Sequence, residues 1–293
     1  MLLPEFDFTE PETLDEACQL MARHGARAKL IAGGTDLMVN MKKRLVEPEH
    51  VVSISRLEDL KMTEKTNAVF KIGACFTVSD LAQSDEIKKE LGAVGAGARA
   101  LGSPLVRNLA TIGGNVASAR PAADLPPSLA AYGSKAVMAS VRGRREVSLD
   151  NFFAGPGLTE ILPDEILCEI HVDIPPAGAG AGYINLGVRK AQDCNLVNVG
   201  SFIALEDDGR TIKSARIVMG CVGPTLLRSL SAEKILIGEK ASDSLFKKAG
   251  KAAAGEAAPI DDFRGSGEYK RDMAGVLTRR TLGAAFDEAR NRQ

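Results

Sequence analysis

The sequence has no tryptophan, and only 4% of its 293 residues are aromatic. Proteins that bind single-stranded nucleic acid usually offer several aromatic rings on which bases stack, and this composition provides no such platform. Basic residues are not in excess either, since 37 Lys and Arg stand against 38 Asp and Glu. That balance argues against the basic field of a general nucleic-acid binder. We therefore expect no nucleic-acid partner.

Long apolar runs are also absent. No stretch of about 18 apolar residues occurs, which excludes a transmembrane helix. Residues 1–10 include acidic residues and no basic cluster, unlike a secretory signal peptide. The sequence therefore predicts a cytoplasmic protein. With 45% hydrophobic and 26% charged residues, its composition is that of a globular chain with one large core or two to three smaller ones.

Cysteine and histidine are few and scattered. No two cysteines have the Cys-x-x-Cys spacing of a zinc or iron–sulfur site, and the three histidines lie far apart. An odd number of cysteines without a secretory signal indicates free thiols. No Ser-His-Asp pattern is evident, so we expect neither a metal nor a catalytic side chain. The cysteines are Cys18, Cys75, Cys168, Cys194 and Cys221.

The first part of the chain alternates helical and extended segments. Thr13 and Glu16 form a capping box for a helix over residues 12–25, which Gly25 can end. The Ala- and Gly-rich residues 92–102 predict a helix that packs closely on a neighbour. A further helix is expected over 79–91, strands over 28–32, 51–54, 69–76 and 165–174, and a hairpin over 136–149.

The stretch from Pro175 to Gly182 is rich in Pro, Gly and Ala, which predicts a linker and a domain boundary. Residues 207–210, Asp-Asp-Gly-Arg, supply a hairpin turn beyond it. The C-terminal third reads as a sheet followed by helices, so the chain as a whole is predicted to be α+β. Its strands are expected over 183–188, 197–205 and 211–222, and its helices over 231–237, 242–258 and 266–290.

Two glycine pairs are the clearest candidates for a ligand site. One lies in Ala32-Gly33-Gly34-Thr35-Asp36, after a predicted strand, and the other in Thr111-Ile112-Gly113-Gly114-Asn115. Glycine lets the backbone approach a ligand closely, and successive N–H groups in such a turn form an anion-binding nest. A diphosphate needs several donors of this kind. A lone glycine pair is more often a simple turn, so the residues alone leave two alternatives, simple turns or a nucleotide-binding α+β protein.

Two other patterns have structural rather than functional interpretations. Residues 95–100, Gly-Ala-Gly-Ala-Arg-Ala, fit the dinucleotide fingerprint, but a charged helical segment precedes them where that fingerprint requires a strand. Tight helix packing is the favoured use of these glycines. The basic stretches 42–44 and 142–145 are interpreted as exposed surface, because isolated charge runs are usually solvated.

At the two glycine motifs the sequence resembles the flavin-binding medium subunits of the molybdenum hydroxylases, a family that includes carbon monoxide dehydrogenase and xanthine dehydrogenase. Four more stretches carry the resemblance over nearly the whole chain: Pro121–Leu125, Asp164–Leu167, Arg189–Asp193 and Arg216–Pro224. The resemblance implies a vanillyl-alcohol-oxidase (PCMH) type FAD-binding domain over 1–175, with subdomains over about 1–58 and 59–175. A linker over 176–182 and a C-terminal α+β domain over 183–293 would follow.

The resemblance also implies where a non-covalently bound FAD would lie. Its diphosphate would rest on the two glycine motifs, with Thr35, Thr111 and Asn115 completing the phosphate shell. Asp124 would accept hydrogen bonds from ribose hydroxyls; the alternative is a helix cap before Leu125. The residues assigned to the cofactor are Ala32, Gly33, Gly34, Thr35, Asp36, Leu101, Thr111, Ile112, Gly113, Gly114, Asn115, Asp124, Leu167 and Lys190.

Some of these positions have rival interpretations or depart from the family pattern. Leu101 and Leu167 match positions near the adenine or flavin, yet each alone would pass for a core residue. The family often has a flavin-proximal lysine where this chain has Asn185, so Arg189 or Lys190 would stand in for it. Residues 194–195, Cys-Asn, replace the usual aromatic-Ala pair. The cysteine-rich insertion that binds a 4Fe–4S cluster in one branch of the family is missing, so no such cluster is expected.

The function implied by the resemblance is that of an FAD-carrying electron-transfer subunit. A large molybdenum-cofactor subunit would oxidise the substrate, and a small subunit with two 2Fe–2S clusters would relay electrons to FAD. The acceptor would be a molecule such as NAD or ferredoxin, and the expected assembly is a dimer of heterotrimers. Two alternatives stay open: a self-sufficient flavin reductase or oxidase on the same fold, and a non-catalytic nucleotide-binding assembly factor.

Overall fold

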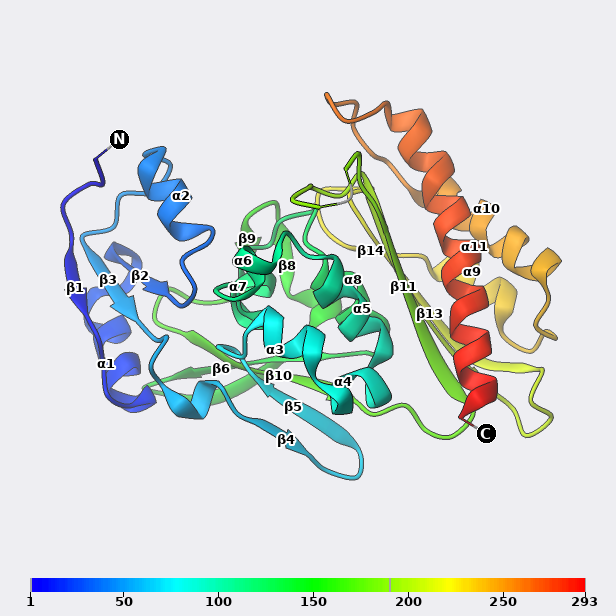
Figure 1. Ribbon diagram of the computed structural model, residues 1–293, viewed down its shortest axis with the longest axis horizontal. Helices are drawn as coiled ribbons and strands as arrows, with labels where there is room; N and C mark the ends of the chain where they lie inside the picture. The colour runs from blue at the N-terminus through cyan, green and yellow to red at the C-terminus, as the bar shows by residue number, and fades with distance from the viewer. Residues whose placement is uncertain (1, 190, 293) are drawn as a thin grey trace.

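The computed structural model describes residues 2–189 and 191–292. The elements form three units that follow one another along the chain (Figure 1). The first is a small α/β unit at the N-terminus, the second is built on a five-stranded sheet, and the third is a four-stranded sheet flanked by long helices. Three clusters of buried apolar side chains support them. The predicted α+β organisation is therefore present.

The first unit is a parallel sheet of three short strands in the order β1-β3-β2. Its first helix is capped as predicted, because Thr13 Oγ1 accepts a hydrogen bond of 3.1 Å from the backbone N–H of Glu16. Gly25 ends that helix with a φ of +53°. The elements are β1 (Asp7–Thr9), α1 (Leu14–His24), η1 (Gly25–Arg27), β2 (Ala28–Ile31), α2 (Leu37–Lys42), β3 (His50–Ser53) and η2 (Glu58–Leu60).

The second unit is an antiparallel sheet in the order β4-β5-β10-β6-β7 with short helices on one face. Phe70, Ile72, Met138 and Ile170 belong to the apolar cluster that joins the sheet to these helices. The strands are β4 (Thr63–Lys65), β5 (Val69–Gly73), β6 (Lys135–Ser140), β7 (Gly143–Ser148), β8 (Phe153–Gly155), β9 (Leu158–Thr159) and β10 (Ile166–Asp173). The helices are α3 (Val78–Gln83), α4 (Asp85–Glu90), α5 (Gly92–Ala100), α6 (Pro104–Arg107), α7 (Ile112–Ala117), α8 (Leu125–Ala131) and η3 (Leu149–Asn151).

The first unit packs against the other side of β6 and β10. Val137 and Cys168 of these strands share an apolar cluster with Ala17, Cys18 and Met21 of α1. All five side chains are nearly inaccessible to solvent. The two units of the N-terminal half are therefore held together by a common core.

The helix predicted over residues 79–91 is wrong in one respect, because two short helices, α3 and α4, take its place. Ser84 separates them with a ψ of 119°, outside the helical range. Its Oγ accepts a hydrogen bond of 3.2 Å from the N–H of Ile87 and so begins α4. Serine competes for backbone hydrogen bonds in this way more readily than alanine or leucine, which favours a helix start over a helix interior.

The third unit is an antiparallel sheet in the order β11-β12-β13-β14. Helix α11 lies along β11 and β12 on one face, whereas α5 and α8 of the second unit contact the other face (Figure 1). The strand predicted over 197–205 coincides with β12. The elements are β11 (Ala179–Leu186), β12 (Val197–Leu205), β13 (Ile212–Gly220), β14 (Leu227–Arg228), α9 (Leu230–Leu236), α10 (Asp243–Glu256) and α11 (Gly267–Asn291).

The segment predicted as a linker is only partly irregular, since β11 already begins at Ala179. Gly180 and Gly182 lie on the face of β11 that meets α11. A Cβ at Gly180 would lie 2.5 Å from the carbonyl oxygen of Ala285, and one at Gly182 would lie 2.5 Å from that of Thr281. These glycines allow the strand to approach the helix. The glycines that predicted a linker therefore serve close packing instead.

Candidate cofactor site

The structure brings the first glycine motif against the chain that leads into the second. A Cβ on Gly33 would overlap the carbonyl oxygen of Leu109, two residues before Thr111. A second contact lies nearby, where Arg120 Nη2 donates a hydrogen bond of 3.3 Å to Asn40 Oδ1. The two motifs, far apart in sequence, therefore meet at the boundary between the first and second units.

The first motif is a loop of unpaired backbone donors. It connects the end of β2 to the start of α2, and Gly34 has a φ of +69°, a conformation that favours glycine. Within the described part of the chain, the N–H groups of Gly33, Gly34, Thr35 and Asp36 make no hydrogen bonds. Four adjacent donors without acceptors fit a phosphate-bearing ligand, because unpaired N–H groups and a helix N-terminus both favour anions.

The second motif is not a loop of free backbone donors, so the prediction of such a loop is wrong for these residues. Residues 112–117 form helix α7, and Thr111 is its N-cap. The N–H of Ile112 donates to Phe76 O (3.0 Å), and that of Gly113 donates to Ala74 O (2.9 Å). The N–H of Gly114 donates to Thr111 Oγ1 (3.0 Å). These amides are consumed by the fold, so they form no nest.

Gly113 and Gly114 have separate roles in this helix. Gly113 is buried, and a Cβ there would lie 2.5 Å from the Cβ of Ala74, so glycine is required for α7 to pack on the turn after β5. Gly114 is exposed and leaves the first turn of α7 open to solvent. The second motif therefore offers a smooth surface beside the donor loop instead of additional backbone donors.

Helix α8 is capped by the side chain of Asn115 and not by that of Asp124, the residue directly before the helix. Asn115 Oδ1 accepts a hydrogen bond of 3.2 Å from Leu125 N and thereby caps helix α8. Asp124, at the N-cap position, makes no capping bond with its side chain. The alternative interpretation of Asp124 as a helix cap is therefore wrong.

Asp124 instead belongs to a buried network with the third unit. Its Oδ1 accepts hydrogen bonds from Tyr183 Oη (3.1 Å) and from Asn195 Nδ2 (2.8 Å). Burial raises the pKa of the Asp124 carboxyl, and these two donors oppose the rise. Sequence reasoning missed Tyr183 as a site residue and noted Asn195 only as a departure from the family pattern, because both roles depend on how β11, β12 and their connection meet the segment before α8.

Leu101 and Leu167 lie in the core of the second unit, where both side chains are almost fully buried. Leu101 ends α5, and the next residue, Gly102, accepts a hydrogen bond of 3.1 Å at its carbonyl from Gln192 N. The turn that contains Arg189 and Gln192 is thereby placed beside the end of α5. Lys190, also predicted at the cofactor, lies outside the described residues.

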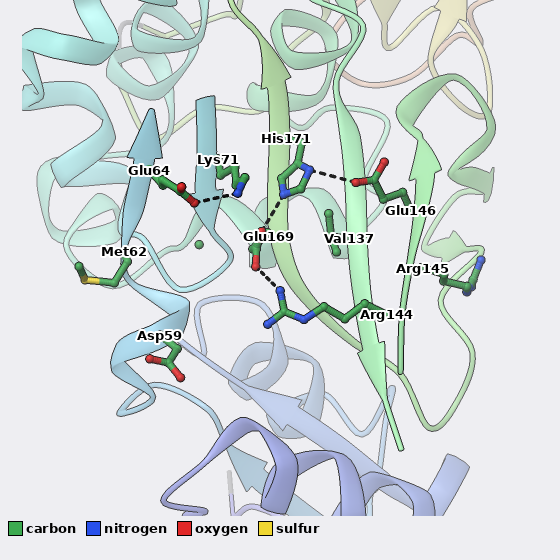
Figure 2. A pocket seen from close by; sticks show the side chains of 11 residues that line it. Asp59, Met62, Glu64, Lys71, Val137, Arg144, Arg145, Glu146, Glu169 and His171 are labelled. Carbon is green, nitrogen blue, oxygen red and sulfur yellow. Dashed lines mark hydrogen bonds and ion pairs between the residues drawn. The ribbon is translucent and has the colours of Figure 1, made fainter. Parts of the chain in front are cut away.

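A cavity of about 560 Å³ lies elsewhere, on the sheet face that carries charged residues (Figure 2). None of the predicted cofactor residues lines it. His171 contacts Glu169 at 2.7 Å and Glu146 at 3.2 Å, and Lys71 contacts Glu64 at 2.8 Å. The lining cations Lys71 and Arg144 already have carboxylate partners, Glu64 and Glu169, so the cavity is a poor match for an anionic cofactor.

No group of three or more His, Cys, Asp and Glu side chains arranged to hold a metal occurs in residues 2–189 and 191–292. Within the same ranges, no helix combines the length and apolar character that crossing a bilayer would require. All five cysteines are free thiols, and Cys194 is the exposed one.

The arrangement defines an α+β protein with a candidate nucleotide site where two units of its N-terminal half meet. Comparison with protein families identifies residues 4–176 as an FAD-binding domain of molybdopterin dehydrogenases. Residues 183–285 match the C-terminal domain of carbon monoxide dehydrogenase flavoproteins.

Sequence matches to known proteins cover nearly the whole chain. The carbon monoxide dehydrogenase medium chain of Hydrogenophaga pseudoflava is 33% identical, and the match covers 98% of this chain and 99% of that protein. The nicotine 6-hydroxylase medium subunit of Paenarthrobacter nicotinovorans is 30% identical, with 96% and 98% covered. The solved structure of H. pseudoflava carbon monoxide dehydrogenase lacking the Mo-pyranopterin moiety superimposes with a TM-score of 0.93 over 98% of this chain and 99% of that one.

The chain belongs to the FAD-binding medium subunits of the molybdenum hydroxylase family. The family resemblance inferred from the glycine motifs is confirmed. An FAD-binding domain followed by a C-terminal domain of the carbon monoxide dehydrogenase flavoprotein type is confirmed as the fold. The protein is accordingly a flavoprotein subunit of an oxidoreductase.

Proposed function

We propose that the chain binds one FAD non-covalently at the boundary of the first two units and passes electrons from 2Fe–2S clusters to an external acceptor. The observation that carries the proposal is the loop 32–36, whose four adjacent N–H groups have no acceptor among residues 2–189 and 191–292 and lie beside the chain that leads into α7. A diphosphate supplies the acceptors that this loop lacks. Family membership supports FAD as the source of that diphosphate.

The side chains around the loop complete the proposed site. Thr111 Oγ1 accepts from Gly114 N, so its hydroxyl hydrogen can donate to a phosphate oxygen. Asn115 Oδ1 is used by α8, which leaves the Nδ2 hydrogens for the ligand. Thr35 would add a third donor. Asp124, held at Oδ1 by the third unit, would accept hydrogen bonds from the ribose hydroxyls.

No side chain of this chain would act as a catalytic acid or base. FAD, when bound, supplies the exchange of electrons. The residues of this chain bind the cofactor, fix its orientation and limit access to it. Leu101 and the turn around Arg189 would lie on the side of the nucleotide or flavin ring, and Lys190, the next residue in sequence, would supply a second cation there.

The proposed partners are a large molybdenum-cofactor subunit and a small 2Fe–2S subunit, in a dimer of heterotrimers in the cytoplasm. The names of the relatives support this assembly, since each is the medium chain or subunit of its complex. The solved relative is a carbon monoxide dehydrogenase that lacks the Mo-pyranopterin moiety of the molybdenum cofactor, which supports a molybdenum-cofactor partner. The electron acceptor is proposed to be a soluble carrier such as NAD or ferredoxin.

The test is to purify the full-length chain, record its visible spectrum and identify the cofactor released by heat. We expect flavin bands and about one FAD per chain, or uptake of one FAD when the apoprotein is titrated with it. Mass spectrometry of the heated protein should give the mass of the unmodified polypeptide. A colourless protein that takes up no FAD would contradict the proposal, and a flavin adduct on the polypeptide would contradict its non-covalent part.

A further inference from the structure

One buried side chain, Asn195, connects the third unit to the proposed cofactor residue Asp124. It lies in the connection between β11 and β12 and is 4% exposed. Its Nδ2 donates to Asp124 Oδ1 at 2.8 Å and to the carbonyl oxygen of Ala122 at 3.1 Å. Its Oδ1 accepts from Asn185 Nδ2 at 2.9 Å. Both polar atoms of the Asn195 side chain are therefore engaged, and each bond has a different partner.

The same segment is held at two further points by the third unit. Asn198 Nδ2 donates to Ala123 O at 2.8 Å and to Tyr183 Oη at 3.1 Å. The Tyr183 hydroxyl in turn donates to Asp124 Oδ1. Residues 122–124 are thus fixed by side chains of β11, β12 and their connection. Both side-chain donors to the Asp124 carboxylate come from the third unit, although Asp124 itself belongs to the FAD-binding domain.

Asn185 and Asn195 are also two of the positions at which the sequence departs from the pattern it resembles. The structure shows that these two departures are bonded to each other. Two neutral amides, Asn185 and Asn195, therefore stand where that pattern has a lysine and an alanine, and they lead by hydrogen bonds to the Asp124 carboxylate. Asn185, Asn195 and Asp124 thus form one continuous hydrogen-bonded chain, in which the loss of one member affects the others.

We propose that Asn195 is a positioning residue, which fixes the Asp124 carboxylate for the cofactor and makes cofactor affinity depend on the third unit. The proposal rests on the proposed function. Without the Asn195 amide, Oδ1 of Asp124 retains a single side-chain donor, and the carboxylate is free to turn away from the ribose. Asn185 supports Asn195 from the far side, so its effect passes through Asn195.

The experiment titrates FAD into the full-length apoprotein and into the variants Asn195→Ala, Asn185→Ala and the double variant. We expect Asn195→Ala to bind FAD about tenfold or more weakly, the usual effect of losing a hydrogen bond to a charged group. Asn185→Ala should weaken binding less, and it should have no further effect when Asn195 is already alanine. Ser201→Ala is the matched control. Ser201 lies in β12 of the same sheet, and the change removes its buried hydrogen bond of 2.7 Å to Thr281 of α11, away from Asp124. This control should bind FAD like the wild type.

A pH series separates positioning from general loosening of the fold. The titratable groups that face Asp124 are Tyr183 of β11 and Cys221 after β13. FAD affinity should fall as the pH drops through the pKa of Asp124, because the protonated carboxyl accepts ribose hydroxyls poorly. Removal of a donor raises that pKa, so the midpoint should lie at a higher pH in Asn195→Ala and in Tyr183→Phe, and should be unchanged in Ser201→Ala.

The outcomes are distinguishable. If the wild type binds FAD and Asn195→Ala binds it with the same affinity and the same pH midpoint, the positioning role is overturned and the proposed function stands. If Asn195→Ala does not fold, Asn185→Ala and Tyr183→Phe provide the same two readouts, and unchanged values in both overturn the proposal. A wild-type chain that takes up no FAD overturns both proposals together.

Discussion

Gly33 lies against the carbonyl oxygen of Leu109 with no space between them for a side chain. One residue belongs to the loop after β2 and the other to the turn before α7, so this contact sets the distance between the two glycine motifs. The unpaired N–H groups of the loop are held in place by it. The geometry of the proposed phosphate site therefore depends on a close approach of two backbones, which glycine alone permits.

The first prediction concerns Gly33→Ala. A Cβ would overlap backbone atoms that cannot rotate away, so the loop must shift and the four donors must separate. We expect FAD binding to fall by at least 100-fold, and the free energy of unfolding to drop by about 1–3 kcal/mol, as for other overpacked sites. Fluorescence titration with FAD and urea denaturation measure the two effects.

Its control is Gly283→Ala in helix α11, a glycine with no atom near its Cβ position. This change should leave FAD binding intact and raise the free energy of unfolding by about 0.5–1 kcal/mol, because alanine stabilises a helix interior. Wild-type FAD affinity in Gly33→Ala would show that the loop does not hold the cofactor.

The fold was predictable where local pattern and long-range packing agree. The apolar stretch 197–205 predicted β12 from end to end, and the capping box at Thr13 predicted the start of α1. The prediction was wrong where glycine served packing. Gly180 and Gly182 predicted a linker, but they lie in a strand because α11, a hundred residues later, passes over them. Nothing in the local sequence specifies that helix as their neighbour.

The candidate site was predicted only in part, for a related reason. Glycine motifs identify where a backbone can approach a ligand, and the loop 32–36 has the predicted free donors. In the second motif the N–H groups of Ile112 and Gly113 are already bonded, because Phe76 and Ala74 accept from them. Similarly, Tyr183 and Asn195 bond to Asp124 across the boundary between units. Such partners are set by the tertiary arrangement, which spacing along the chain does not encode.

The basic stretch 142–145, predicted to be exposed, is exposed in large part but also paired. Arg144 contacts Glu169 at the cavity in Figure 2, and Arg142 contacts Asp164. Arg145 donates from Nε to Glu165 Oε1 at 2.6 Å and from Nη2 to Glu165 Oε2 at 2.7 Å. The Glu165 carboxylate also accepts from Leu162 N. The charges of this hairpin therefore attach β7 to the start of β10.

The second prediction follows from Glu165. Its side chain is buried, and the hydrogen bonds from Arg145 hold the pKa of its carboxyl below the usual value. The stabilisation is fully present above the unfolded pKa of about 4.3 and is lost as the pH falls through the lower, folded value. Glu165→Gln should therefore lower the free energy of unfolding by about 1–2 kcal/mol at pH 7, a figure reduced for the partly exposed Arg145.

Urea denaturation at several pH values measures this difference. The two stability curves should begin to converge as the pH falls below the unfolded pKa of about 4.3 and should meet once the pH is below the lowered, folded pKa, where wild-type Glu165 is protonated too. Glu47→Gln serves as the control, because the ion pair between Glu47 and Arg44 is exposed on both sides and should contribute nothing measurable. A difference between Glu165→Gln and wild type that stays constant down to the lowest pH would show that the carboxylate charge is not responsible.

The third prediction concerns the thiols, of which Cys194 is the exposed one. Burial raises the pKa of Cys75 to about 12 and that of Cys168 to about 11, and a buried thiol of high pKa reacts slowly. Cys221 also has a pKa raised to about 12, and its Sγ donates to the carbonyl oxygen of Pro121 at 3.2 Å. In the folded chain, a chromogenic disulfide reagent should therefore label one thiol rapidly, and five after denaturation. Cys194→Ser should abolish the rapid phase while Cys221→Ser retains it, and rapid labelling that survives Cys194→Ser would mean that another thiol is accessible.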